Sequence, residues 1–432
     1  MKAHRPWQGG CLVAVILLAL AGVPSVNAAA PVPLTFYYPV AVAGPLAKIV
    51  NTYVDEFNKT HPDIVITPVF TGDYDQTRAK IVTALVGGRP PDVAVLLSAD
   101  LLTMVQMSAI IPLDGFIAKE PKGWADDFQP AFWLNSRADG KTWSIPFQRS
   151  SPILFYNKDL FAKAGLDPNR PPRTWDELVT DARRLTVRSP SGEVVQWGVE
   201  IPTSSQGATY WLLQGFVLQA GSPFFEPSGR KVYLTSPGAK AALRFWYSLV
   251  YTYHVMPPGV LNLVAVPSDF VAQRTAMFFH STGNLSFVRR EAHFRFGTAF
   301  MPKRARYGCP TGGGNLYIFR GVPASHQEAA WTFIEWLTSP ERAAKWSMDS
   351  GYIATRKSAY GVPEMRTFVT EWPQYLVARD QLAYCQEELM TYANQKVYNI
   401  INEAVQHVMT GAQLPDAALS WAQAQVDQAL AP

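Results

Sequence analysis

Cysteine is scarce in this chain of 432 residues, and neither sign of charge dominates it. Three cysteines, Cys11, Cys309 and Cys385, are too few for a disulfide framework or a cysteine-rich zinc site. The 38 basic and 34 acidic residues give a formal net charge of +4 and form no basic block, which argues against a nucleic-acid partner. With 48% hydrophobic residues, the composition is that of a folded globular protein.

Catalytic and cofactor motifs are also missing. The sequence has no Gly-x-Ser-x-Gly elbow, no phosphate-binding P-loop, no Gly-x-Gly-x-x-Gly after a strand and no His-Glu-x-x-His. Its seven histidines are scattered singly, so we expect neither a metal site nor a cofactor. No carboxylate pair or triad of a hydrolase can be named. These absences favour a binding protein over an enzyme, with a secreted hydrolase as the remote alternative.

Long apolar runs are absent beyond the N-terminus. There, two basic residues precede an apolar run over residues 11–23, and small residues follow it, as in a secretory signal peptide. The run is shorter than the ~20 residues that span a bilayer. We predict a signal peptide over residues 1–28, cleaved after Ala28 or Ala29, and export of the remaining chain.

Two cysteines, Cys309 and Cys385, remain after that cleavage. In an oxidising compartment two cysteines pair if their Cα atoms come within disulfide range. The sequence does not show whether these two do, so their pairing is left open.

The residues that follow the N-terminal segment alternate between strand and helix patterns. Predicted strands cover residues 34–38, 64–70 and 92–97, and amphipathic helices with 3.6-residue spacing cover 44–58 and 75–86. This order is typical of βαβ units in a parallel sheet, and we predict an α/β fold. Ligands of such sheets bind beyond the carboxyl ends of the strands.

Beyond residue 140 the pattern becomes less regular. Further strands are predicted over residues 142–147, 152–157, 197–200, 296–301 and 316–319. Further helices are predicted over residues 158–165, 208–219, 237–253 and 269–277. Another helix is predicted to begin at Trp175, and much of the chain after residue 325 is predicted to be helical. Two polar segments, 148–151 and 310–315, are predicted as turns between strands. Thr174 and Glu177 have the spacing of a capping box.

Four segments, 90–93, 145–158, 172–178 and 269–277, carry a resemblance to a known family. The most specific is Phe155-Tyr156-Asn157-Lys158, followed by Pro172-Arg173-Thr174-Trp175-Asp176-Glu177-Leu178. Over residues 33–425 the chain resembles the extracellular solute-binding proteins of bacterial ABC importers, in the maltose-binding-like group.

The resemblance implies an α/β, two-lobed periplasmic-binding-protein fold of class II, with the ligand cleft between the lobes. Lobe one is expected to comprise residues 31–148 plus 280–340, and lobe two residues 149–279 plus 341–432. It also implies a monomer in the periplasm that binds a small-molecule solute and delivers it to the permease subunits of an ABC importer in the inner membrane.

Within the group, the chain is most similar to the branch that binds glycerol 3-phosphate. The ligand residues of that branch match five positions, which are Tyr74, Ser150, Ser281, Gly313 and Tyr352. Two positions depart from it. Ser98, with Asp100 two residues further on, stands where the branch has an acidic residue for the glycerol hydroxyls, and Tyr398 stands where it has an arginine for the phosphate.

The missing arginine bears on the ligand, because an arginine that pairs bidentately with phosphate is not replaced by a tyrosine. Arg149 is the one cation in the matched motifs. A glycerophosphodiester carries one charge where glycerol 3-phosphate carries nearly two, so we expect the diester to bind more tightly. The alternative is an uncharged sugar or polyol, which flat aromatic faces suit and which Tyr398, with Tyr210 or Trp211, would accommodate.

Overall fold

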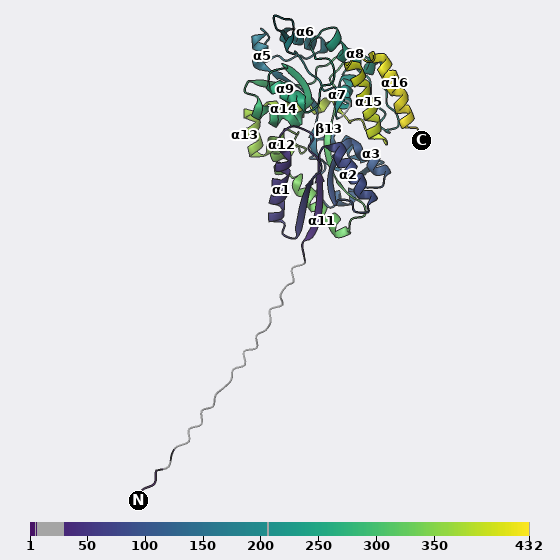
Figure 1. Cartoon of the computed structure of the whole chain (residues 1–432). Helices are drawn as coiled ribbons and strands as arrows, with labels where there is room; N and C mark the ends of the chain where they lie inside the picture. The colour runs from purple at the N-terminus through teal and green to yellow at the C-terminus, as the bar shows by residue number, and fades with distance from the viewer. Residues whose placement is uncertain (5, 7–29, 205–206, 432) are drawn as a thin grey trace.

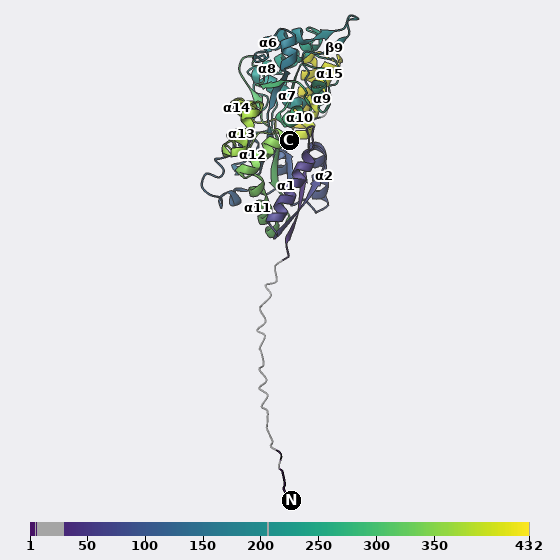
Figure 2. The ribbon, with the colours of Figure 1, turned by 90° about the vertical axis from the view of Figure 1, so that its left-hand side faces the viewer.

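The computed structural model describes residues 1–4, 6, 30–204 and 207–431. The predicted signal peptide, residues 1–28, lies for the most part outside the described residues and stays a prediction. Among the helices of the described chain, none combines the length and the apolar character needed to cross a membrane. The folded part consists of two lobes, one above the other in Figures 1 and 2.

The lower lobe of Figure 1 is built on a five-stranded sheet with the order β2-β1-β3-β13-β6. The strands are β1 (Val32–Tyr38), β2 (Ile64–Phe70), β3 (Val93–Leu97), β6 (Ile145–Ser150) and β13 (Gly312–Ile318). β1 pairs in parallel with β2 and β3, whereas β13 runs antiparallel to both β3 and β6. The predicted parallel βαβ units are therefore present, extended by antiparallel strands from later in the chain.

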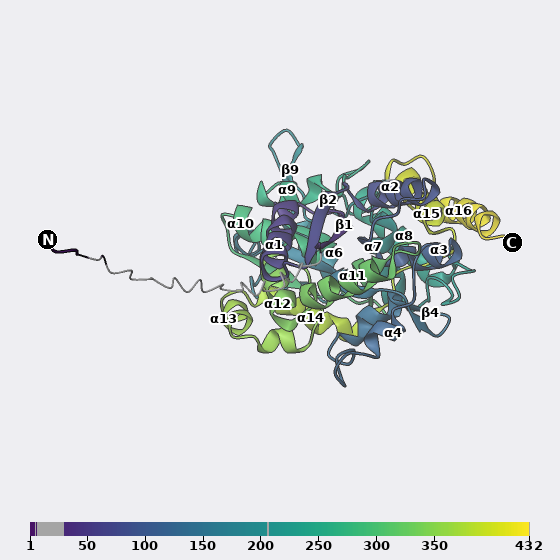
Figure 3. The ribbon, with the colours of Figure 1, turned by 90° about the horizontal axis from the view of Figure 1, so that it is seen from below.

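Helices cover this sheet, as the view from below in Figure 3 shows. α1 (Leu46–Thr60) buries one apolar face, as its spacing predicts, and α11 (Ala324–Leu337) packs on β1. α2 (Tyr74–Val86) begins at Asp73, whose carboxylate accepts a hydrogen bond from the Gln76 amide at 2.8 Å. The Gln76 side chain accepts one from the Asp73 amide in return, and this capping box fixes where Tyr74 and Asp75 start the helix.

The upper lobe contains a three-stranded antiparallel sheet in the order β10-β7-β11, formed by β7 (Pro152–Asn157), β10 (Met277–Ser281) and β11 (Phe296–Ala299). Its main helices are α6 (Trp175–Leu185), α7 (Thr209–Gln219), α8 (Pro237–Tyr251), α15 (Asn394–Met409) and α16 (Pro415–Ala429). Every residue of α7 is buried, because α8 and α15 both pack against it.

The other elements are short or peripheral. The helices are α3 (Leu101–Gln106), α4 (Asp114–Ile117), α5 (Lys158–Lys163), α9 (Ala265–Val271), α10 (Leu285–Glu291), α12 (Pro340–Ser350), α13 (Pro363–Glu371) and α14 (Gln374–Gln381). The strands are β4 (Arg137–Ala138), β5 (Lys141–Thr142), β8 (Val187–Arg188), β9 (Val194–Gln196), β12 (Cys309–Pro310) and β14 (Cys385–Gln386). The 3₁₀ helices are η1 (Ser98–Asp100), η2 (Pro130–Asn135), η3 (Thr282–Asn284), η4 (Ser358–Gly361) and η5 (Leu382–Tyr384).

The chain passes between the lobes more than once. β6 belongs to the lower sheet and β7 to the upper one, and only Ser151 separates them. The chain returns from β11 in the upper sheet to β13 in the lower sheet. The residue boundaries given above for the two lobes stay a prediction.

Both polar segments that the sequence predicts as turns are strands. Residues 148–150 complete β6, and residues 312–315 begin β13, which pairs with β3 on one side and β6 on the other. These pairings satisfy the backbone of a glycine-rich segment that has no strand propensity of its own. Gly313 has φ +91°. A methyl group on it would lie 1.9 Å from the Gln148 carbonyl oxygen, so only glycine fits there.

Three smaller predictions also need correction. The helix predicted over 269–277 lies earlier, as α9, and β10 begins at Met277. Residues 197–200 pair through isolated bridges and form no strand. Thr174 caps α6 by accepting from the Glu177 amide, but the Glu177 carboxylate accepts from the amide of Arg173, so the capping box is half formed.

Cys309 and Cys385 form a disulfide, with their Cα atoms 4.6 Å apart. β12 and β14 pair in parallel with these two residues in register. The sequence leaves this pairing open because 76 positions separate the two cysteines. The bond ties the segment before Glu387 and Glu388 to β12.

Candidate ligand-binding cavity

A cavity of about 240 Å³ collects the ends of several elements from both lobes. Six of the eight predicted site residues line it, namely Tyr74, Ser150, Ser281, Gly313, Tyr352 and Tyr398. The volume is below the ~300–1,000 Å³ of drug-sized pockets, which suits a small solute. The six residues span 74 to 398 in the sequence, so no contiguous segment carries the cavity.

Two strand ends and the start of a helix supply three of these side chains. Ser150 is the last residue of β6, Ser281 is the last of β10, and Tyr74 is the first of α2 after β2. The Ser281 hydroxyl accepts from the Gly283 amide at 3.1 Å. The Tyr74 hydroxyl donates to the Gln148 side-chain oxygen at 3.2 Å. The cavity therefore presents hydroxyls held by backbone and side-chain contacts, as recognition of a polar solute requires.

Tyr352 forms a rigid part of the lining. It follows Gly351, which ends α12 in the left-handed conformation, and its ring stacks on Trp346 with centroids 5.8 Å apart. Burial raises the pKa of Tyr352 to about 12, and burial also raises the pKa of Tyr74 far above its ordinary value. Both hydroxyls keep their protons at neutral pH and are neutral groups in the lining.

Ser98 and Asp100, the other two predicted site residues, do not line the cavity. The 3₁₀ turn η1 begins directly after β3 and buries both side chains, so that Leu97 lies at the lining instead. Asp100 forms an ion pair with Arg78 at 3.0 Å. The Ser98 hydroxyl donates to Glu388 at 3.5 Å.

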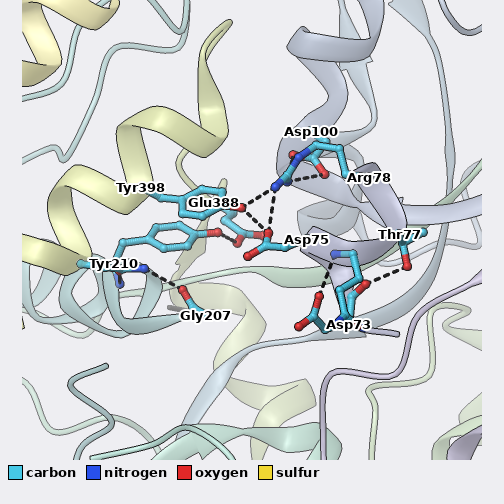
Figure 4. A network of polar contacts seen from close by, with 11 residues as sticks. Asp73, Asp75, Thr77, Arg78, Asp100, Gly207, Tyr210, Glu388 and Tyr398 are labelled. Atoms are coloured by element: carbon cyan, nitrogen blue, oxygen red, sulfur yellow. Dashed lines mark hydrogen bonds and ion pairs between the residues drawn. The ribbon is translucent and has the colours of Figure 1, made fainter. Parts of the chain in front are cut away.

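Tyr398 takes part in a network that joins α2 of the lower lobe to α15 of the upper lobe (Figure 4). Its hydroxyl accepts from Arg78 at 2.8 Å and donates to Asp75. Arg78 is 5% exposed and forms ion pairs with Asp75 and Asp100. An arginine therefore does lie behind Tyr398, but its charge is already matched by two carboxylates.

Arg149, the cation expected from the matched motifs, is fully buried and does not line the cavity. Its guanidinium donates to Thr311 at 3.1 Å and to Asn315 at 3.3 Å. Burial lowers its pKa to about 10, so it remains charged at neutral pH. The guanidinium stabilises the strands behind the cavity and leaves the lining without its charge.

Glu388 is a lining residue that the sequence did not reveal. Its carboxylate accepts from the Tyr210 hydroxyl at 2.6 Å, and its amide donates to Asn135 at 2.9 Å. Burial raises its pKa to about 8. It lies on a loop with no local signal beyond the pair Glu387-Glu388, and its partners come from distant segments, so only the fold identifies it.

His280 also lines the cavity, although it was one of the scattered histidines in the sequence. Its Nδ1 accepts from the Ser281 amide at 2.8 Å, and its Nε2 donates to the Leu263 carbonyl at 2.8 Å. Burial lowers its pKa to about 4. The ring is neutral at pH 7 and brings no positive charge to the lining.

Among the described residues that line the cavity, three are acidic and none is lysine or arginine. The acidic residues are Asp73, Asp75 and Glu388, and the aromatic ones, besides His280, are Tyr74, Tyr210, Trp211, Tyr352 and Tyr398. In the described part of the chain, no three histidine, cysteine, aspartate or glutamate side chains come together as metal ligands. The site is thus aromatic and acidic, with hydroxyl donors.

Comparison with known proteins defines the class. The model of the bacterial extracellular solute-binding protein family matches residues 52–375, and the chain belongs to this family. The prediction of a solute-binding component of an ABC importer is confirmed. Members of this extracellular family bind solutes.

Several relatives of this chain carry names that state the solute they bind. The chain is 28% identical to the sn-glycerol-3-phosphate-binding periplasmic protein UgpB of Yersinia pseudotuberculosis serotype I (strain IP32953), over 94% of this chain and 93% of the relative. It is 27% identical to UgpB of Escherichia coli O1:K1 / APEC, over 94% of each.

Solved structures confirm the predicted two-lobed, maltose-binding-like fold. UgpB from Mycobacterium tuberculosis in complex with glycerophosphocholine matches with a TM-score of 0.80 at 23% identity, over 92% of this chain and 98% of that one. Maltose-bound MalE3 of T. maritima matches with a TM-score of 0.79 at 22% identity, over 92% and 99%. These two likenesses establish the fold, and the ligand must be argued from the cavity.

Proposed function

We propose that this protein binds a glycerophosphodiester in the cavity and presents it to the permease of an ABC importer. The observation that carries the choice of ligand is that the described lining contains no lysine or arginine. A phosphate monoester brings nearly two negative charges, and leaving a buried charge unpaired costs several kcal/mol. A diester brings one charge, to which the hydroxyls of Ser150 and Ser281 can donate hydrogen bonds at the lining beside Tyr74 and Gly313.

The relatives support the same class of ligand. Proteins named for binding glycerol 3-phosphate resemble the chain over nearly its whole length, and a structural neighbour holds glycerophosphocholine. The five lining residues that match ligand positions of the family, Tyr74, Ser150, Ser281, Gly313 and Tyr352, are the contacts that we propose for the glycerophosphate part, and Tyr398 is proposed to contact the rest of the solute. Ser98 and Asp100 are proposed to act indirectly, through Glu388 and Arg78.

We propose that the two lobes close over the solute when it binds. We also propose that the protein acts as a monomer in the periplasm. The lobes already share hydrogen bonds near the cavity. Arg78 reaches Tyr398 on one side, and the Ala43 amide donates to Asn284 at 3.3 Å on another. Closure presents a surface that the permease subunits recognise.

Calorimetry and thermal shift with four solutes test the proposal: glycerophosphocholine, glycerophosphoglycerol, glycerol 3-phosphate and maltose. Solutes that bind the native state raise Tm by mass action. We expect at least one diester to bind more tightly than glycerol 3-phosphate. Tighter binding of glycerol 3-phosphate than of either diester would overturn the choice of a diester.

The second candidate is an uncharged sugar or polyol. The observation that favours it is the number of aromatic side chains in a lining without lysine or arginine among its described residues. Flat aromatic faces suit sugar rings. In the same titration, binding of maltose but of no diester would select this candidate.

A further inference from the structure

The buried carboxylate of Glu388 is not among the contacts proposed for the glycerophosphate part. Glu388 is 2% exposed and lies on the loop between β14 and α15, at the cavity. One carboxylate oxygen accepts from Tyr210 at 2.6 Å, and the other accepts only a long bond from Ser98 at 3.5 Å. Within the described chain, no lysine, arginine or histidine lies within ion-pair distance of it. It is therefore a buried acid that takes part in no ion pair of the described residues.

Several charged and titratable groups face Glu388 without forming an ion pair with it in the described part of the chain. Arg149 from β6 lowers its pKa through its charge, but its guanidinium donates to Thr311 and Asn315 and forms no ion pair with Glu388. Asp100 from η1 raises it, and the phenols of Tyr210, Tyr74 and Tyr317 face it from α7, α2 and β13. Burial outweighs these effects, and the pKa of about 8 means that Glu388 carries a proton at neutral pH in the protein alone.

The polar hydrogens of Tyr210, Tyr398 and Trp211, which lie around Glu388, are all donated to groups of the protein itself. The Tyr210 and Tyr398 rings stack with centroids 5.0 Å apart, and Figure 4 shows their hydroxyls directed towards the carboxylates of Glu388 and Asp75. The Trp211 indole N–H donates to the Thr311 carbonyl at 2.7 Å. Since these donors are occupied, this side of the cavity offers carboxylates and aromatic rings to a ligand. That combination favours an organic cation, which aromatic faces attract and whose charge an ionised Glu388 can match.

We propose that Glu388, with the rings of Tyr210, Tyr398 and Trp211, forms a subsite for an ammonium head group, and that the solutes of this protein are glycerophosphodiesters with such a cationic head. This inference rests on the proposed function. The glycerophosphate part lies towards Ser150, Ser281 and Gly313, and the head group lies towards Glu388. The cation replaces the proton of the carboxyl, which leaves to solvent, so binding releases a proton.

The experiment is calorimetry at pH 7 in two buffers with different ionisation enthalpies. The ligands are glycerophosphocholine and glycerophosphoglycerol, two diesters that differ in the charge of the head group. We expect glycerophosphocholine to bind about tenfold more tightly, with release of about one proton, and glycerophosphoglycerol to bind without proton release.

The variant Glu388→Gln keeps an oxygen for Tyr210 and Ser98 and removes the charge. We expect it to lose about tenfold in affinity for glycerophosphocholine, to lose the proton release, and to keep its affinity for glycerophosphoglycerol within about twofold. Glu387→Gln is the matched control. Glu387 is adjacent in sequence and partly buried but does not line the cavity, so this change should alter neither affinity nor proton release.

The outcomes separate the two proposals. Equal affinity of the unmodified protein for both diesters, without proton release, would overturn the head-group subsite and leave the proposed function standing. Failure to bind any diester would overturn the proposed function, and the inference would fall with it. If Glu388→Gln does not fold, the proton release of the unmodified protein still decides the matter.

Discussion

The hydroxyl of Tyr398 lies between a guanidinium and a carboxylate, and this position decides what the residue offers a ligand. It accepts from Arg78 and donates to Asp75, so both of its polar functions are used within the protein. Burial raises its pKa well above the ordinary value, so it stays neutral. Tyr398 therefore offers the cavity only its aromatic ring, which lies near the acidic residues Asp75 and Glu388. An arginine at the same position would bring a positive charge instead.

An arginine at position 398 should therefore change which solute binds. We expect Tyr398→Arg to raise the affinity for glycerol 3-phosphate relative to glycerophosphocholine by about tenfold or more, because the guanidinium can pair with the monoester dianion. Calorimetry with both ligands on both proteins measures the ratio. Tyr398→Phe is the control, since it keeps the ring and should keep the preference. An unchanged ratio in Tyr398→Arg would mean that this position does not select ligand charge.

At the scale of elements, what the sequence predicts well is local. The first three strands of the main sheet and the two helices between them follow from apolar spacing, and α6 follows from its cap at Thr174. The sequence of segments 148–151 and 310–315 predicts turns, because their strand structure depends on pairing with each other and with β3. That pairing joins residues more than 160 positions apart, and no local pattern shows it.

Some residues of the candidate site can likewise be predicted from the sequence, whereas others cannot. Six lining residues lie in motifs that a family resemblance can locate one by one. Ser98 and Asp100 were expected at the lining because they follow a strand, but the 3₁₀ turn that begins there buries them. Glu388 could not be found, because its contacts with Tyr210 and Ser98 come from elements 178 and 290 residues away.

β13 offers a direct test of the close pairing behind the cavity. Gly313→Ala places a methyl group against the Gln148 carbonyl and strains a backbone with φ +91°, so we expect a loss of about 3 kcal/mol or more in the free energy of unfolding. Solute binding should weaken with it. Denaturant unfolding and calorimetry measure the two effects.

Gly321→Ala is the matched control for that change. Gly321 also has φ +91°, but it is exposed and no atom lies within 4 Å of the added methyl group. It should cost only about 1 kcal/mol of backbone strain and leave binding intact. Equal losses in the two variants would contradict a role for close packing at Gly313.

At the scale of the whole molecule, two buried acids make the stability depend on pH, and one of them also lines the cavity. Glu388 at the cavity and Glu200 in the upper lobe are both buried, and burial raises the pKa of each to about 8. In the unfolded chain both ionise near the ordinary value of 4.5. The folded state therefore holds protons that the unfolded state loses, and the folded state is disfavoured as the pH rises towards 8.

The ligand-free protein should lose stability between pH 6.5 and 8. His280, whose pKa is lowered to about 4, has the opposite effect, but it acts only below pH 6.5. Each carboxyl should contribute a loss of about 1 kcal/mol per pH unit within the window. Thermal unfolding across these pH values measures it, and the double variant Glu200→Gln, Glu388→Gln should flatten the curve. An equally steep fall in the double variant would show that other groups are responsible.

Glu388 lies three residues beyond Cys385, and this proximity connects solute capture to the oxidation of two thiols. The disulfide is the one covalent bond among the contacts described here that hold the loop of Glu387 and Glu388 in place. Hydrogen bonds from the side chains of Asn135 and Gln214 to the backbone of this loop are the others. Thiols stay reduced in the bacterial cytoplasm and oxidise outside it. A chain that has not yet left the cell lacks this tie at the loop that bears its cavity carboxylate. The loop that carries Glu388 is therefore fully held in place only in an oxidising compartment outside the cytoplasm, where a binding protein meets its solutes.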